Sequence, residues 1–140
     1  MLSEARFSEA DVVSHITSFL AGDGYRVRTE VSNMGQSADM VATRNRWVTV
    51  IEVKLRDWKT AMRQCLAHEV VADFVCIAVA HVDPPDEMVA AATERGYGVI
   101  WYNRSGCCCE WVQRPMLNRA VWPPQRYEFS KRLRGVGYVG

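Results

Sequence analysis

The sequence predicts an α/β fold in which helices cover both faces of a mixed sheet. The first half has one amphipathic helix followed by hairpin-like strands, and the second half alternates strand, helix and strand. The apolar run 74–80 is typical of a central strand that is buried on both faces. A chain of 140 residues has the usual size of one domain. We therefore predict a single domain over 1–140, with a core over about 8–113 and a basic tail over 114–140.

The first predicted elements are one helix and three strands. Ser8 begins a Ser-Glu-Ala-Asp segment that resembles a capping box, and the apolar residues after it recur at helical spacing. Gly22 and Gly24 end this helix. The expected strands are 25–32, 39–44 and 47–55, with a loop at 33–37 and a two-residue turn at Asn45-Arg46.

The later elements complete the predicted sheet. Asp57 can cap a helix over about 58–71, whose apolar side would carry Ala61, Met62, Cys65, Leu66 and Val70. After strand 74–80 and a proline-containing loop at 83–86, a helix runs to about Arg95 and is closed by Gly96. The remaining elements are a hairpin of strands 97–103 and 107–113 and a short basic helix near 125–134, after the prolines at 115, 123 and 124.

Composition excludes several classes of protein. Hydrophobic residues make up 49% and charged residues 24%, as in ordinary globular proteins and unlike disordered ones. The formal net charge of +1 argues against a histone-like protein. No apolar run is long enough to span a membrane, and the polar N-terminus does not resemble a secretory signal. We therefore expect a cytoplasmic protein in a reducing compartment.

The five cysteines fit a reduced chain without structural zinc. There is no Cys-x-x-Cys pair, and the three histidines lack zinc-motif spacing. The consecutive Cys107, Cys108 and Cys109 would alternate between faces of a strand, so they cannot supply one tetrahedral site between them.

Positive charge collects in the tail. Residues 111–140 carry six basic residues and one acidic residue, a net charge of +5, interleaved with Trp111, Trp122, Tyr127 and Tyr138. Basic and aromatic side chains together suit a nucleic-acid backbone and exposed bases. The alternative interpretation is a solvated helix whose aromatic side chains pack on the domain.

Candidate chemistry concentrates on the second and third strands. If Asn45-Arg46 is a two-residue turn, counting back along both strands places Asp39 directly opposite Glu52. Lys54 lies two residues after Glu52 and therefore shares its face, which Val41 and Val50 continue as core. Two carboxylates beside an apolar face need compensation, which a Mg²⁺ or Mn²⁺ ion would provide. The alternative is an ordinary charged cluster at a sheet end.

These residues resemble a known motif. Ala38-Asp39, then Glu52-Val53-Lys54, then a helix that holds Gln64, look like the PD-(D/E)XK nuclease superfamily, although Ala38 replaces the proline of the name. The order of elements resembles that superfamily from about residue 8 to residue 80. The resemblance implies a restriction-endonuclease-like αβββαβ core, a Mg²⁺ cofactor, a DNA substrate and a homodimer.

The resemblance also implies roles for single residues. Asp39 and Glu52 would bind the metal, Lys54 would position or activate water, and Gln64 would orient Lys54 or the phosphate. Glu9 in the first helix, or Glu4 in its place, would complete the metal site. We expect His68, one turn after Gln64, to be a hydrogen-bonded or solvent-facing residue and not a catalytic one. The predicted nucleic-acid contacts are Arg44, Arg46, Arg56, Lys59, Arg63, Arg126, Lys131, Arg132 and Arg134.

Two functional hypotheses of different classes follow. The first is a metal-dependent DNA endonuclease or resolvase-like enzyme. The second is a catalytically inactive module of the same fold that binds DNA or assists assembly. A third, lesser interpretation is an unrelated small α/β protein with a charged strand at its surface. We expect no organic cofactor and no membrane partner in any of these cases.

Overall fold

The computed structural model describes residues 8–33, 35–80, 83–105 and 107–137. Its helices are α2 (Glu9–Gly22), α3 (Trp58–His68), α4 (Asp86–Arg95) and α5 (Pro123–Leu133), and its strands are β1 (Arg26–Asn33), β2 (Gln36–Arg44), β3 (Trp47–Lys54), β4 (Phe74–Val79), β5 (Gly98–Asn103) and β6 (Cys108–Gln113). No helix in these ranges is long and apolar enough to cross a membrane.

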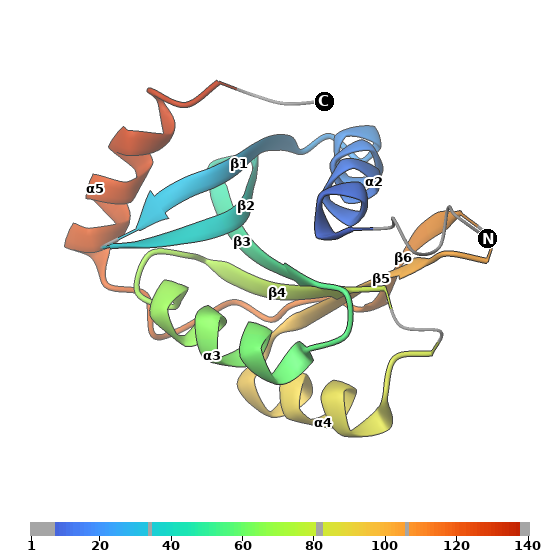
Figure 1. Ribbon diagram of the computed structural model, residues 1–140. Helices are drawn as coiled ribbons and strands as arrows, with labels where there is room; N and C mark the ends of the chain where they lie inside the picture. The colour runs from blue at the N-terminus through green and yellow to red at the C-terminus, as the bar shows by residue number, and fades with distance from the viewer. Residues whose placement is uncertain (1–7, 34, 81–82, 106, 138–140) are drawn as a thin grey trace.

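The six strands form one mixed sheet in chain order, β1-β2-β3-β4-β5-β6. The first three strands and the last two pair antiparallel, whereas β3-β4 and β4-β5 pair parallel through helical crossovers. Helix α2 covers one face of the sheet, and α3 and α4 cover the other (Figure 1). The predicted mixed sheet with helices on both faces is therefore confirmed.

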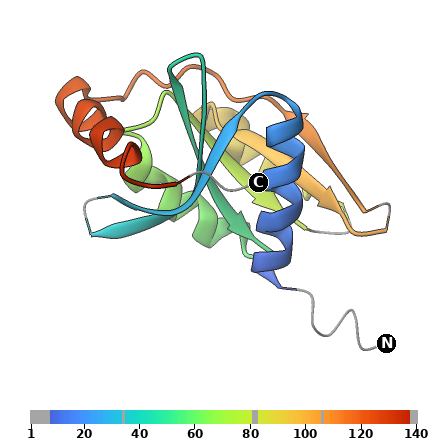
Figure 2. The same ribbon diagram turned by 90° about the horizontal axis from the view of Figure 1, so that it is seen from above.

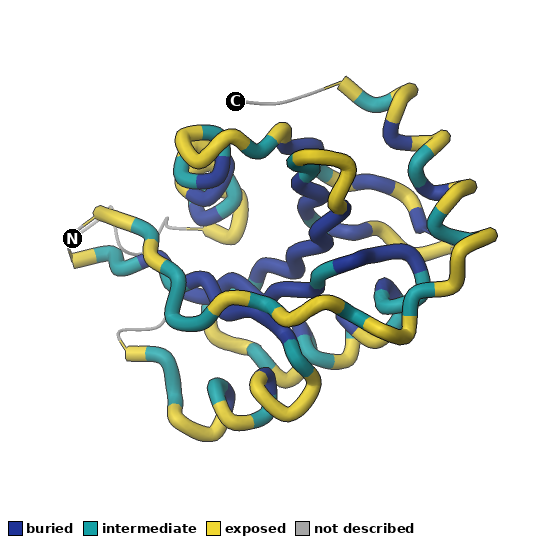
Figure 3. The backbone as a smooth tube through the Cα atoms, turned by 180° about the vertical axis from the view of Figure 1, so that it is seen from behind, coloured by how far each residue is buried: buried dark blue, intermediate teal, exposed yellow. Residues whose placement is uncertain are grey.

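Two apolar cores lie on opposite faces of the sheet. One core places Val12, Ile16 and Leu20 of α2 against Met40 and Ile51. The other joins α3 and α4 to the opposite face of β3 and also includes the α5 residues Phe129 and Leu133. The strands at the centre of the sheet are buried along most of their length, as Figure 3 shows, while the outer sides of the helices are exposed.

The predicted capping box at the start of α2 is present. Ser8 Oγ accepts a hydrogen bond from the Asp11 backbone N–H, and the Asp11 carboxylate accepts one from the Ser8 backbone N–H at 2.7 Å. Asp57 likewise caps α3 by accepting a hydrogen bond from the Thr60 backbone N–H. These caps fix where two helices begin beside β3.

The turn between β2 and β3 has the predicted two-residue form. Asn45 and Arg46 have φ values of 52° and 73°, as a type I′ hairpin turn requires. Arg44 pairs with Trp47, and the register continues to Met40 opposite Ile51. Asp39 and Glu52 are the next two positions in this register.

Several predicted boundaries were wrong. The loop predicted at 33–37 is shorter, because the β1–β2 ladder continues to Asn33 opposite Gln36 and turns at Gly35, where φ is +86°. The side chain of Asn33 is buried and not part of a solvated loop. Cys107 lies in the hairpin turn with φ +51°, and β6 begins only at Cys108.

Two helix predictions also need correction. Helix α3 ends at His68 instead of 71, and Leu66 is 49% exposed instead of packing on the apolar side. Helix α5 begins at Pro123 instead of 125, because proline is tolerated in the first turn, where its missing N–H has no intrahelical partner.

Candidate active site

The pairing of β2 with both of its neighbouring strands is interrupted at Asp39. On one side, pairing with β3 ends at Met40, and the Asp39 carboxylate accepts a hydrogen bond from the Val53 backbone N–H at 2.8 Å. On the other side, the β1–β2 register steps from Thr29–Met40 to Val31–Ala38, and Glu30 between them has φ +53°. A positive φ at a residue with a side chain is a local strain that is often found at functional sites.

The same break changes the face that β2 presents. Met40 packs into the core below α2, whereas Ala38, two residues away, packs into the core below α3. An undistorted strand would place both residues on one face. The backbone of β2 therefore rotates at Asp39. A strand pattern in which side chains alternate strictly between the two faces does not predict this rotation.

Asp39 and Glu52 come together as the register predicts. Burial raises the pKa of Asp39, and the neighbouring Glu52 carboxyl raises it further, to about 6. The Val53 N–H and the Lys54 ammonium act in the opposite direction by stabilising the Asp39 carboxylate. Two neighbouring carboxyls in a buried site repel each other while both are ionised, so this contact favours a proton or a cation between them.

Glu52 is completely buried, with 0% of its side chain exposed. Its Oε1 lies 2.7 Å from His68 Nε2, while its Oε2 has no hydrogen-bond partner among the described residues. A buried carboxylate oxygen without a partner is costly. A positively charged group beside this oxygen would offset that cost.

Asn33 determines which nitrogen of His68 carries the proton. Asn33 Nδ2 lies 3.4 Å from the Ala67 carbonyl oxygen and 2.8 Å from His68 Nδ1. Because the amide N–H₂ donates to both, His68 Nδ1 is the acceptor and Nε2–H donates to Glu52. The three side chains form a buried chain that holds the Glu52 carboxylate in one orientation. Of the two predicted possibilities for His68, hydrogen-bonded or solvent-facing, the first holds, but its partners Asn33 and Glu52 were not predicted.

Lys54 and Glu9 lie beside the carboxyl pair. Lys54 Nζ is 3.9 Å from Glu9 Oε2, and both side chains are partly exposed. Glu9 and Asp39 also line one pocket of about 330 Å³ between α2 and the β1–β2 ribbon. The structure thus brings Glu9, Asp39, Glu52 and Lys54 to one end of β3, and Glu4 lies outside the described residues.

Glu30 is a site residue that the sequence analysis missed. It lines the same pocket as Glu9 and Asp39, and its side chain is exposed at the strained position opposite Asp39. An alternating strand pattern gives no signal for such a residue, because the pattern assumes that φ stays negative along the strand.

Gln64 lies on α3, one turn before His68. Its Oε1 is buried and has no hydrogen-bond partner among the described residues. Helix α3 packs against β3, the strand that carries Glu52 and Lys54. The predicted role for Gln64 in orienting Lys54 stays a prediction.

The predicted nucleic-acid contacts divide into two groups. Arg56, Lys59 and Arg63 lie between the end of β3 and the first turns of α3, on exposed positions near Lys54. Arg44 and Arg46 flank the turn at the other end of β3. Lys131 and Arg132 on α5, and Arg134 directly after it, are exposed; α5 lies along the β1 side of the molecule (Figure 2).

Arg126 is engaged within the fold. Its guanidinium donates to both oxygens of the Asp73 carboxylate, at 2.9 and 2.8 Å, and to the Arg46 carbonyl oxygen at 2.8 Å. Asp73 in turn accepts from the Val48 backbone N–H. These bonds attach α5 to the start of β3, so Arg126 has a structural role, and its contact with nucleic acid stays a prediction.

The donor set fits one divalent cation with an incomplete protein shell. The Asp39 carboxyl and the unpartnered oxygen of Glu52 are hard ligands of the kind that Mg²⁺ and Mn²⁺ take. Among the described residues, no three His, Cys, Asp or Glu side chains form a cluster that could hold a metal. An ion here would therefore take its remaining ligands from water or substrate, as Mg²⁺ commonly does.

Comparison with known proteins gives the fold. No protein-family model and no curated protein matches this sequence. The chain is similar in structure to the SPO1766 protein of unknown function from Silicibacter pomeroyi, with a TM-score of 0.69 and 16% identity over 89% of this chain and 82% of that one. It is also similar to an fdxN element excision controlling factor protein from Anabaena variabilis, with a TM-score of 0.53 and 17% identity over 73% of this chain and 98% of that one. At these identities the similarity establishes a shared α/β fold.

Proposed function

We propose that this protein is a metal-dependent nuclease that hydrolyses phosphodiester bonds in DNA. The observation that carries the proposal is the meeting of the Asp39 and Glu52 carboxyls at the end of β3, where one buried Glu52 oxygen has no partner. The spacing of these residues and the order of the elements that carry them resemble those of the PD-(D/E)XK nucleases. A restriction-endonuclease-like core accounts for both the order of elements and the position of this site.

Each residue has a distinct part in the proposed reaction. Asp39 and Glu52 would hold Mg²⁺ or Mn²⁺, which supplies an activated water and neutralises charge at the phosphate. Lys54 presents its ammonium group beside the carboxyls, where it can bind a phosphate oxygen or orient the attacking water. Glu9 holds Lys54 at this edge, and His68 keeps the Glu52 carboxylate fixed.

A cleavage assay tests the proposal. Single-stranded, duplex, flap and four-way-junction DNA would be incubated with Mg²⁺ or Mn²⁺ and wild type, Asp39→Asn or Lys54→Ala. We expect metal-dependent cutting that falls by at least about a hundredfold in both variants, because each change removes a charge from the site. Asp39→Asn keeps an oxygen that can accept from the Val53 N–H, so the strand ends stay joined.

Lys59→Ala is the matched control for Lys54→Ala. Lys59 is an exposed lysine in the first turn of α3, outside the carboxyl pair. Its removal should leave cleavage within about threefold of wild type, since it contributes at most one phosphate contact. Equal loss of cutting in both lysine variants would contradict a special role for Lys54.

The second candidate function is a nucleic-acid-binding or assembly module without catalysis. It is favoured by the complete burial of Glu52 and its hydrogen bond with His68, which satisfy one carboxylate oxygen without any metal. Titration with Mn²⁺ distinguishes the two. The nuclease should take up Mn²⁺ through Asp39, whereas a module should show no uptake and should bind DNA equally well as wild type and as Asp39→Asn.

A further inference from the structure

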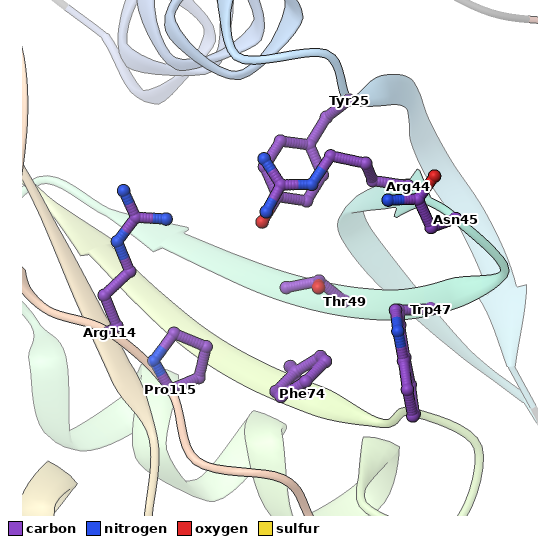
Figure 4. Close-up of a pocket in the computed structure, with 8 residues that line it drawn as sticks. All are labelled: Tyr25, Arg44, Asn45, Trp47, Thr49, Phe74, Arg114 and Pro115. Carbon is purple, nitrogen blue, oxygen red and sulfur yellow. The ribbon is translucent and has the colours of Figure 1, made fainter.

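A second pocket lies at the opposite end of β3 from the carboxyl pair. It has a volume of about 350 Å³, and its walls combine the aromatic side chains of Tyr25, Trp47 and Phe74 with the guanidinium groups of Arg44 and Arg114 (Figure 4). Trp47 is the first residue of β3 and Lys54 is the last. At about 3.3 Å per residue, the two ends of the strand are about 23 Å apart.

One wall of the pocket is an exposed aromatic surface. Trp47 is 48% exposed, and its ring meets the Phe74 ring edge-on, with centroids 5.7 Å apart. Phe74 lies on β4, in register with Thr49 on β3. A tryptophan that keeps half of its surface in water and is held by a neighbouring ring offers a flat, oriented face to a planar ligand.

The other walls carry excess positive charge. The Arg44 guanidinium lies 4.2 Å above the centroid of the Tyr25 ring and donates to an Asp23 carboxylate oxygen at 3.1 Å. The Arg114 guanidinium lies 3.9 Å from the same Asp23 oxygen. One carboxylate therefore pairs with two guanidinium groups. Figure 4 shows these two groups extending over the pocket from two directions. An anionic ligand would compensate the second charge.

The positive surface continues around the turn between β2 and β3. A neighbouring hollow of about 380 Å³ shares Arg44 and is also lined by Arg26 and Arg46, and none of its six lining residues is acidic. A free nucleotide would fill only the aromatic pocket. A second basic hollow beside it suits a ligand that carries several phosphates in a row.

We propose that these two hollows form a binding site for single-stranded nucleic acid. A base stacks against Trp47 and Phe74, and the adjoining phosphates lie against Arg44, Arg114 and the arginines of the turn. A single strand exposes its bases to such a pocket, whereas a duplex keeps them stacked inside. The inference rests on the proposed function in one respect only, the choice of nucleic acid as the class of ligand.

Fluorescence anisotropy of labelled dT₂₀ and rU₂₀, measured in EDTA with the full chain, tests this site without cleavage. We expect Trp47→Ser to weaken binding of both strands by about tenfold, the size usual for loss of one stacked base. Trp122→Ser is the matched control, because Trp122 is 55% exposed and lies outside both hollows. Its affinity should equal that of wild type.

Arg114→Gln gives a second, electrostatic test that does not alter an aromatic contact with Phe74. The slope of log affinity against log salt should become shallower by about 0.7, the value for one lost phosphate contact with a single strand. Arg119 is an exposed arginine on the same segment, and the control variant Arg119→Gln should leave that slope unchanged. Both variants would first be checked for an unchanged melting temperature.

Three results would overturn the inference. The first is that wild type and Trp47→Ser bind single strands with equal affinity. The second is that Trp47→Ser weakens binding of a matched duplex as much as binding of a single strand. The third is that dTMP alone binds as tightly as dT₂₀. None of them bears on the carboxyl pair, since the assay contains no metal. Conversely, loss of cleavage in Asp39→Asn with unchanged strand binding would support the proposed function and leave this site intact.

Discussion

The pKa of the Asp39 carboxyl reflects the buried, acidic surroundings of this side chain. Its pKa is raised to about 6, first by burial and then by the neighbouring Glu52 carboxyl, against an ordinary value of 3.8. A carboxyl that resists ionisation in a buried cluster is poorly compensated by the protein alone. A divalent cation removes that penalty, whereas a purely structural carboxylate is usually stabilised in its ionised form.

The raised pKa of Asp39 predicts how stability depends on pH in the metal-free protein. Between about pH 4 and pH 6 the folded state binds more protons than the unfolded state, so the free energy of unfolding falls as pH rises through 6. After allowance for solvent screening of this half-buried group, we expect a loss of about 1–2 kcal/mol. Urea denaturation in EDTA at pH 4 and pH 7 measures it. Asp39→Asn should show a smaller fall over the same range, and an identical fall would contradict this assignment.

His68 is expected to act as a positioning residue through Glu52. His68→Leu leaves the buried Glu52 carboxylate without its donor, so we expect a loss of about 2–3 kcal/mol in the free energy of unfolding. The double variant His68→Leu with Glu52→Gln should recover part of that loss, because it removes the uncompensated charge. Chemical denaturation of the four members of this cycle measures the coupling. Strictly additive effects would show that the two residues do not interact.

A metal readout separates positioning from simple stability. His68→Gln keeps a donor near the Glu52 carboxylate and should retain most of the stability that His68→Leu loses. Its Mn²⁺ affinity should fall by about tenfold or more, as is usual when the partner that orients a ligand is changed. Unchanged Mn²⁺ affinity in His68→Gln would limit His68 to a role in folding.

At the scale of elements, the close approach of β5 to the segment after β6 depends on Gly98. A Cβ added at Gly98 would lie 2.7 Å from Pro115 Cδ and 2.9 Å from Cys76 Sγ. We expect Gly98→Ala to cost about 1–3 kcal/mol through overpacking. Gly22→Ala is the control, since a Cβ there meets nothing within 4 Å and should be neutral or slightly stabilising. Thermal denaturation of both variants tests the comparison, and equal melting temperatures would refute the overpacking argument.

Local patterns predicted most of the elements correctly. The capping box at Ser8, the turn at Asn45-Arg46 and the continuous apolar run of β4 each encode an element within a few neighbouring residues. The boundaries at Asn33 and His68 could not be predicted in this way. Those two side chains meet across the fold in a buried hydrogen bond, and such a long-range contact leaves no signal in the neighbouring residues.

The candidate site was predictable in part for the same reason. The opposition of Asp39 and Glu52 follows from a two-residue turn and a fixed register, so the sequence alone placed them together. The strained backbone at Glu30 and the pairing of His68 with Glu52 arise from tertiary packing and leave no periodic signal. The ion pair of Arg126 with Asp73 was not predicted either, because the composition of a basic tail does not reveal which of its charges is bound within the fold.

At the scale of the whole molecule, the two ends of β3 have opposite chemical character. Carboxyls gather at the Lys54 end, and arginines and aromatic rings gather at the Trp47 end. A nucleic acid long enough to reach both ends would be attracted by the basic end, and a cation beside the carboxyls would reduce their repulsion of a phosphate at the other end. Metal binding and strand binding should therefore support each other in the full chain.

Metal binding should also stabilise the whole fold in a pH-dependent way. A ligand at a hundred times its dissociation constant adds about 2.7 kcal/mol to the free energy of unfolding. Protons compete with the cation for Asp39 below pH 6, so the rise in melting temperature with saturating Mn²⁺ should be larger at pH 7.5 than at pH 5. Differential scanning fluorimetry at the two pH values measures both shifts. Lys59→Ala should match wild type and Asp39→Asn should show almost no shift, whereas a full shift in Asp39→Asn would place the cation elsewhere on the molecule.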